Sequence, residues 1–259
     1  MVAFLWPKRA EMASSSFNEA VVYESQGRYD EAMELYKKSL DIQIMVFAQG
    51  KVRAHPSVAT TYNNMGKVFH SQGKDAEALE LYQESLRIWF KLHGKYHPDV
   101  AASYNNIANV FQSQGKYREA MAMYKKSLKI KIRVLGAEHP SVASSYNNMG
   151  SVLQSQRKYE KALALYTKGL HIKINFHKEE HPSLAASYNN MGTIFQSQGK
   201  HAKALEFYTR SLEIFVKALG RDHSAVATSY SNMAVVHVSQ GNTEVAVMPF
   251  PHRLVYTQL

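Results

Sequence analysis

Histidine is the residue type in this chain whose spacing most directly suggests chemistry. The chain has 12 histidines and no cysteine, so a metal site would have to use imidazole and carboxylate ligands. His177 to His181 read His-Lys-Glu-Glu-His, which matches the H-x-x-E-H spelling of one class of zinc peptidase. That motif needs a continuous helix, and Pro182, directly after His181, interrupts one. The sequence therefore predicts neither a metal site nor a catalytic site here.

A histidine also recurs at a fixed interval along the chain. The dipeptide His-Pro begins at positions 55, 97, 139 and 181, and His-Ser begins at 223, so each histidine follows the previous one by 42 residues. A constant period of roughly 20–50 residues is typical of stacked repeats. Packed helices lie about 8–10 Å apart, so equivalent histidines two helices apart cannot share one metal ion. We expect these histidines to close a link between repeats.

One copy, residues 98–139, shows the structure of the repeat. Val100, Tyr104, Ile107 and Phe111 recur at helical spacing, and a second helical stripe follows after Gly115. Glycine is typical of a helix C-terminus, and proline, here Pro98, is tolerated in the first turn of a helix. The repeat is therefore predicted to be two helices joined by a tight turn.

The recurring residues of this copy resemble a known repeat. They are Tyr104, Ile107, Ala108 and Phe111 in the first helix, and Gly115, Tyr117, Ala120, Tyr124, Ser127 and Leu128 around the turn and in the second helix. This pattern resembles the tetratricopeptide repeat. The 42-residue period, the Asn-Asn pair and the Leu-Gly-x-x-His-Pro link are similar to the repeats of kinesin light chain-like and nephrocystin-like proteins. The resemblance implies an all-α, right-handed α-solenoid whose first helices line a concave groove.

The period divides the chain into units. We expect an N-terminal tail over residues 1–12, a solenoid over residues 13–248, and an irregular tail over residues 249–259. The units are predicted to span residues 13–54, 55–96, 97–138, 139–180, 181–222 and 223–248, which makes about five full repeats and a truncated sixth. The sixth is truncated because Pro249 and Pro251 interrupt its second helix. Arg157 takes the place of the turn glycine found in other copies, so replacing it with glycine is predicted to stabilise the array.

The polar stripe of each first helix is the candidate binding surface. Asparagine and glutamine amides each carry donors and acceptors, so amides along a groove can pair with the backbone of an extended peptide. The alternative is that they only keep the groove wall soluble. The resemblance makes Asn106, Asn148 and Asn190 the first candidates for peptide contact. The full candidate set is Asn63, Asn64, Lys67, Asn105, Asn106, Asn109, Gln112, Asn147, Asn148, Gln154, Asn189, Asn190, Gln196 and Asn232.

Composition narrows the class of protein and partner. The formal net charge is +10, which favours an acidic partner, unless the lysines simply coat the outer helices. The apolar run near the start, Val2 to Trp6, is shorter than the core of a signal peptide. No stretch reaches the roughly 18 apolar residues expected of a membrane-spanning helix. We therefore expect a cytoplasmic protein with no cofactor.

Three function classes can be compared on the sequence. The first is a non-catalytic scaffold or adaptor, similar to kinesin light chain, that binds a protein or peptide in its groove. The second is a basic helical-repeat protein that binds RNA, which is disfavoured because the stripe lacks stacking aromatic residues. The third is an enzyme, which is disfavoured because no nucleophile elbow or phosphate loop is present. Lys67 is the lone cation on the stripe, which argues against a lysine- and arginine-based clamp for a C-terminal carboxylate.

Overall fold

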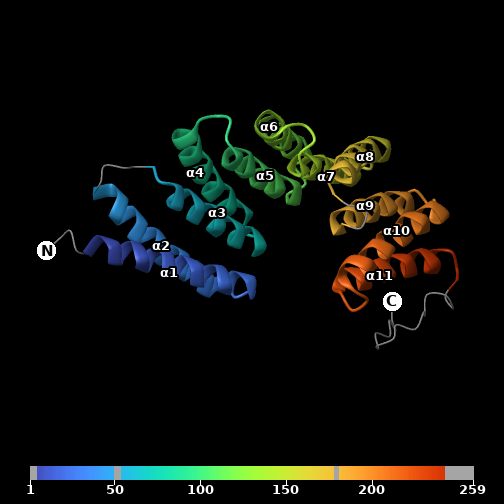
Figure 1. The fold of residues 1–259 in the computed structure, drawn as a ribbon, viewed down its shortest axis with the longest axis horizontal. Helices are drawn as coiled ribbons and strands as arrows, with labels where there is room; N and C mark the ends of the chain where they lie inside the picture. Colours follow the sequence, from blue (N-terminus) through green and yellow to red (C-terminus); the bar gives the residue numbers. More distant parts are fainter. Residues whose placement is uncertain (1–4, 50–53, 178–180, 243–259) are drawn as a thin grey trace. The chain divides into compact units, whose positions relative to one another are not determined.

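The computed structural model describes residues 5–49, 54–177 and 181–242, which form eleven α-helices and no β-strand (Figure 1). Consecutive helices pair into hairpins, as the 42-residue period predicted. In chain order the helices are α1 (Leu5–Ser25), α2 (Tyr29–Gln49), α3 (Pro56–Ser71), α4 (Asp75–His93), α5 (Pro98–Ser113), α6 (Tyr117–Leu135), α7 (Pro140–Ser155), α8 (Tyr159–Phe176), α9 (Pro182–Ser197), α10 (His201–Leu219) and α11 (Ser224–Ser239).

Contacts divide the chain into two compact units, Met1–Ala137 and Glu138–Leu259. The first unit holds the hairpins α1–α2, α3–α4 and α5–α6, and the second holds α7–α8, α9–α10 and the helix α11. Within each unit a hairpin packs against the next one, through α2 on α3 and α4 on α5 in the first, and through α8 on α9 and α10 on α11 in the second. Each unit therefore buries its core between neighbouring hairpins, as repeat proteins do.

The recurring histidine starts the first helix of each hairpin from α3 onwards. At each start the imidazole Nδ1 accepts a hydrogen bond from the backbone N–H two residues later, at 3.1 to 3.3 Å. The bond satisfies one of the N–H groups that a helix start leaves without a partner. Proline fills the first helical position of α3, α5, α7 and α9. These histidines were predicted to close the link between repeats, and in the structure they do so by capping the helix that follows.

The turn between the two helices of a hairpin needs one residue with positive φ. Gly27, Gly73, Gly115, Gly199 and Gly241 supply it, with φ between 70° and 79°. In the α7–α8 turn the residue is Arg157, whose φ is 56°. It is the one non-glycine residue with positive φ in the described part of the chain. A residue with a Cβ in this conformation costs about 1–2 kcal/mol.

Replacing Arg157 with glycine is expected to raise the free energy of unfolding by about 1 kcal/mol, after allowing for the greater freedom of glycine in the unfolded chain. The reciprocal control is Gly199→Arg in the equivalent turn of the next hairpin, which should lower stability by a similar amount. Urea denaturation followed by circular dichroism measures both changes. Equal stabilities of wild type and both variants would contradict the strain argument.

In three hairpins, α3–α4, α7–α8 and α9–α10, a buried tyrosine of the second helix packs against a glycine of the first helix. Tyr166 is 1% exposed, and a Cβ placed on Gly150 would lie only 2.7 Å from its Cε1 atom. Tyr208 packs in the same way against Gly192. The small residue is required because the two helices approach so closely there that the ring occupies the space of a side chain.

Serines on the second helices add a further bond inside three of the hairpins. The hydroxyls of Ser39, Ser85 and Ser127 donate to the backbone carbonyls of Ala13, Ala59 and Ala101, at 2.7 to 2.8 Å. Each of the three serines is fully buried. The bonds hold the two helices of a hairpin in one register, because donor and acceptor lie 26 residues apart in every case.

One end of the predicted solenoid can be compared with the structure. The sequence predicted a tail over residues 1–12, whereas α1 begins at Leu5. The first repeat lacks the His-Pro that marks the other helix starts, so nothing in the period located this start. The predicted interruption of the sixth repeat by Pro249 and Pro251, and the predicted tail over residues 249–259, lie outside the described residues.

Candidate functional site

The predicted site residues lie on the first helices α3, α5, α7, α9 and α11. All of the predicted asparagines and glutamines are half-buried, and Lys67 is exposed. The asparagine pairs stand at equivalent places in successive helices because the period is constant. We call these pairs the amide face; it comprises Asn63 and Asn64 of α3, Asn105 and Asn106 of α5, Asn147 and Asn148 of α7, Asn189 and Asn190 of α9, and Asn232 of α11.

Within each unit, amides of neighbouring first helices are hydrogen-bonded to one another. In the first unit, the Asn106 Nδ2 donates to Asn63 Oδ1 at 2.7 Å. In the second, the Asn232 Nδ2 donates to Asn189 Oδ1 at 2.8 Å. A carboxamide has two donor hydrogens and two acceptor lone pairs, so a single such bond leaves capacity for a ligand. The amide face therefore contributes to packing between neighbouring first helices of each unit.

The glutamines about two helical turns after the asparagine pairs have a role in the fold that sequence reasoning missed. Tyr166 donates its hydroxyl hydrogen to Gln154 Oε1 at 2.8 Å, and Tyr208 donates to Gln196 Oε1 at 2.6 Å. Tyr124 is bonded to both Asn109 Oδ1, at 2.5 Å, and Gln112 Oε1, at 2.9 Å.

These amide oxygens satisfy tyrosine hydroxyls that would otherwise be buried without a partner. Burial raises the pKa of Tyr124 and of Tyr166 to about 12. The joint recurrence of tyrosine and glutamine with the 42-residue period was the signal available in the sequence.

Lys67, predicted to face the ligand as a lone cation, is paired within the chain. Its Nζ lies 2.6 Å from Glu24 Oε1 of the preceding hairpin. The other oxygen of that carboxylate accepts a hydrogen bond from Tyr36 at 2.7 Å. Lys67 therefore balances a nearly buried carboxylate. The sequence did not indicate this ion pair, because the two residues lie more than forty positions apart.

An open cavity of about 470 Å³ lies in the second unit and brings two of the predicted residues together. Gln154 of α7 and Asn190 of α9 both line it, beside Ser155, Thr193 and Ser197. Arg157 of the α7–α8 turn contributes the one charged side chain of the lining. The cavity is thus lined both by Asn190 of the amide face and by Arg157 of the α7–α8 turn. From the sequence alone, this turn was considered only for its effect on stability.

Comparison with known proteins identifies the repeat. A tetratricopeptide repeat profile matches residues 57–133 and 177–250, and a second tetratricopeptide repeat profile matches residues 18–57 and 142–183. The first profile alone covers more than half of the chain. The chain belongs to the tetratricopeptide repeat family. The family resemblance and the all-α solenoid fold predicted from the sequence are both confirmed.

Solved tetratricopeptide structures share this fold. BtubC (BKLC) from P. vanneervenii is 20% identical, with a TM-score of 0.71, over 89% of this chain and 98% of that one. A putative kinesin light chain from Podosopora anserina with nearly identical repeats is 25% identical, with a TM-score of 0.61, over 74% of this chain and 91% of that one. A signal-transduction ATPase from Pyrococcus horikoshii that carries a tetratricopeptide repeat sensor is 16% identical, with a TM-score of 0.69, over 90% of this chain and 34% of that one.

A search of curated proteins gives no match. Tetratricopeptide repeats generally form protein–protein interaction scaffolds and are typically non-catalytic. Among the described helices, none combines the length and the apolar character needed to cross a membrane.

Three of the link histidines of this tetratricopeptide chain, His55, His97 and His181, stack on a neighbouring ring. The rings of His177 and His181 are 3.7 Å apart, and α8 ends at Phe176, so the H-x-x-E-H spelling does not lie within one helix. Glu180 of that spelling lies outside the described residues. Burial, together with His181 and Lys173, lowers the pKa of His177. The positions of these rings match their role in closing the links.

His93, His97 and Asp99 form a group that could in principle hold a metal ion, because one ligand atom of each lies within 4.8 Å of the others. However, the His93 and His97 rings stack nearly parallel, at 4.0 Å and 18°. Lone pairs in the planes of parallel rings do not converge on one ion. The Nδ1 atom of His97 also accepts the capping bond of α5. The arrangement therefore suits helix capping better than coordination.

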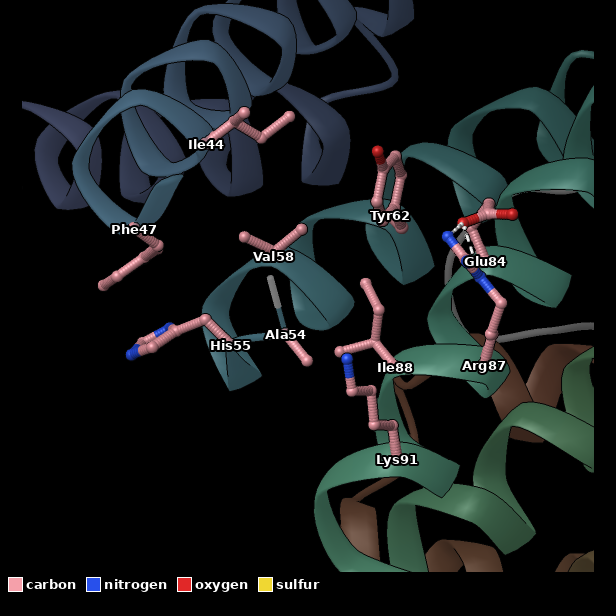
Figure 2. A pocket seen from close by; sticks show the side chains of 10 residues that line it. All are labelled: Ile44, Phe47, Ala54, His55, Val58, Tyr62, Glu84, Arg87, Ile88 and Lys91. Carbon is pink, nitrogen blue, oxygen red and sulfur yellow. Dashed lines mark hydrogen bonds and ion pairs between the residues drawn. The ribbon is translucent and has the colours of Figure 1, made fainter. Parts of the chain in front are cut away.

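A second cavity, of about 460 Å³, lies in the first unit and contains none of the predicted site residues (Figure 2). Its apolar part is formed by Ile44 of α2, Val58 of α3 and Ile88 of α4. The Glu84–Arg87 ion pair, 2.6 Å long, lies on one side of it (Figure 2).

Lys173 of α8 is a buried lysine that sequence reasoning did not single out. It is 6% exposed, and its Nζ donates to the Ser183 carbonyl at 2.9 Å and to Ser187 Oγ at 2.8 Å, both on α9. No ion pair of the described residues includes it, and burial lowers its pKa to about 8. The lysine is held by two neutral acceptors in a site that disfavours its charge.

Proposed function

We propose that this chain is a non-catalytic scaffold or adaptor that binds an extended segment of a partner protein along its amide face. The observation that carries the proposal is the recurrence of half-buried asparagines at one place on the first helices of each unit, as pairs on α3, α5, α7 and α9 and as Asn232 alone on α11. A peptide backbone offers one N–H and one C=O per residue, and carboxamides can pair with both. Recognition of this kind depends little on the side chains of the partner. Kinesin light chain-like cargo binding is the specific version of this function that the family resemblance suggests.

Three features favour a peptide over RNA as the ligand. Single-stranded RNA binds where bases can stack on exposed aromatic rings. The recurring tyrosines Tyr36, Tyr124, Tyr166 and Tyr208 are instead fully buried between helices. Lys67, the one cation predicted on the face, is paired with Glu24. The amides that remain are neutral groups suited to a polypeptide backbone.

The proposal predicts that replacing Asn106, Asn148 and Asn190 together with alanine will abolish most peptide binding. If each amide contributes one net hydrogen bond of about 1 kcal/mol, affinity should fall on the order of 100-fold. Fluorescence polarisation with pools of short labelled peptides of random sequence, graded from acidic to basic, measures the change. Circular dichroism and thermal melting of each variant establish that the helices persist.

A matched control replaces Gln26, Asn175 and Gln240 with alanine, because these are exposed amides outside the amide face. This variant should bind as the wild type does. Equal loss in both variants, or unchanged binding in the first, would argue against the amide face as the binding surface. A labelled RNA pool tested in parallel, at low and high salt, decides between the two ligand classes: RNA binding with a steep salt dependence would favour the alternative.

A further inference from the structure

One turn of the array uses a residue that its backbone conformation disfavours. Arg157 has a φ of 56°, whereas glycine stands at the equivalent place in the five other described turns. Strained backbone positions tend to persist where the side chain serves a function. The question is therefore what the Arg157 side chain does that glycine could not.

The side chain lines the open cavity of about 470 Å³ in the second unit. Gln154 and Ser155 of α7 and Asn190 of α9 are part of the same lining. None of the residues that line it is acidic. The nearby Glu160 of α8 is outside the lining, and its carboxylate accepts a hydrogen bond from Gln198 at 3.2 Å. The positive charge in the cavity thus has no counter-ion among its walls.

The donors of the cavity are available for a ligand. Within the residues that the structure describes, no hydrogen bond or ion pair involves the Arg157 guanidinium or the Asn190 amide. A guanidinium carries five N–H donors arranged to hold two oxygens of one anion, and a carboxamide adds two more. Tyr166 uses its hydroxyl on Gln154, so that part of the wall is fixed in place. A cation beside neutral donors, in a cavity whose lining contains no acidic residue, is complementary to an anion.

We propose that this cavity is an anion subsite of the amide face, in which Arg157 holds a carboxylate or phosphate group on a side chain of the bound partner. The inference rests on the proposed peptide-binding function. It adds a preference for a partner with an anionic side chain, and it assigns that side chain to the cavity beside Arg157. Asn190 belongs to both surfaces, so a peptide paired with the amide face in the second unit passes the cavity. The strain at Arg157 is then the cost of placing a cation at the edge of an otherwise neutral surface.

The test uses the whole chain and four pools of short labelled peptides with random flanks. The central residue of the pools is glutamate, phosphoserine, glutamine or serine. Wild type should bind the glutamate or phosphoserine pool about tenfold or more tightly than its neutral counterpart, as a charge-assisted hydrogen bond predicts. The acidic pool that is bound more tightly identifies the anion as carboxylate or phosphate.

Arg157→Gly should remove this preference while leaving the protein folded, because glycine suits the turn. Arg157→Lys should retain only part of it, since an ammonium cannot hold two oxygens as a guanidinium does. The matched control is Lys158→Gln, which removes the same charge from the adjacent exposed residue outside the cavity and should keep the preference.

The two proposals fail in different ways. If wild type binds all four pools equally, or if Arg157→Gly and Lys158→Gln behave alike, the anion subsite is wrong and the amide face stands. If wild type binds none of the pools, both are wrong. An acidic preference that Arg157→Gly alone removes supports the subsite.

Discussion

Replacing Lys173 with methionine is expected to raise the free energy of unfolding at pH 7 by about 2 kcal/mol. A lysine whose pKa falls from 10.5 to about 8 pays about 3 kcal/mol to remain charged in the folded protein, and the two hydrogen bonds to α9 return part of that cost. The equivalent positions of α4 and α10 carry Trp89 and Phe215, while those of α2 and α6 carry Gln43 and Lys131, so an apolar side chain is compatible with the packing of at least two hairpins. Chemical denaturation of both proteins measures the difference.

The same substitution should change the pH dependence of stability. Between about pH 8 and pH 10 the folded protein releases the Lys173 proton while the unfolded chain keeps it, so the stability of the wild type rises with pH. Above about pH 10 the buried tyrosines act in the opposite sense, because burial raises their pKa above that of the unfolded chain.

In the Lys173→Met variant the rise between about pH 8 and pH 10 should be reduced to the part contributed by Lys131, whose pKa burial also lowers. Lys173→Arg is the matched control, because arginine keeps the positive charge between about pH 8 and pH 10. This variant should be less stable than the wild type at every pH in that range. Parallel pH profiles for wild type and the methionine variant would show that the site does not penalise the charge.

Replacing Tyr166 with alanine is expected to lower the free energy of unfolding by about 3–5 kcal/mol, the largest effect of any single change considered for this chain. The ring is fully buried, it fills the space above Gly150, and its hydroxyl holds Gln154. Its loss leaves a cavity between the two helices of a hairpin, which neither helix can close by itself. Thermal or urea denaturation gives the magnitude.

Two phenylalanine variants separate the ring from the hydroxyl. Tyr166→Phe removes only the hydroxyl, which bonds to Gln154 and also to Ser151, and should cost about 1 kcal/mol. Tyr82 is buried in the equivalent place, but its hydroxyl has no hydrogen-bond partner among the described residues, so Tyr82→Phe should be nearly neutral. Equal costs for the two phenylalanine variants would show that the Gln154 bond contributes nothing.

The sequence predicted the hairpins closely because each repeat marks its own helix ends. Pro98 begins α5 and Gly115 follows its end, as the residue types required. The start of α1 was missed because the first repeat has no such mark. Arg157 was predicted to be strained in its turn, and its positive φ confirms the conformation on which that prediction depends.

The candidate site could be predicted only in part. The period placed the asparagines on one face, because equivalent residues of successive repeats must occupy equivalent positions. It could not indicate which amides bond to each other, nor that Glu24 would pair with Lys67, because these contacts join different hairpins. The burial of Lys173 likewise depends on Ser183 and Ser187 of the next hairpin. Side-chain contacts between repeats can be identified only from the structure, whereas the repeat itself can be identified from the sequence.

The histidine caps give the array a property that a single helix cap would not. An imidazole accepts a hydrogen bond through Nδ1 only when the ring is neutral and its proton is on Nε2. Five helix starts depend on that one tautomer, at His55, His97, His139, His181 and His223. Protonation of Nδ1 would replace the acceptor with a positively charged donor at the positive end of a helix, and at His97 the new N–H could donate to the Asp99 carboxylate, 3.3 Å away. Repetition thus multiplies a small local sensitivity to acid along the length of the chain.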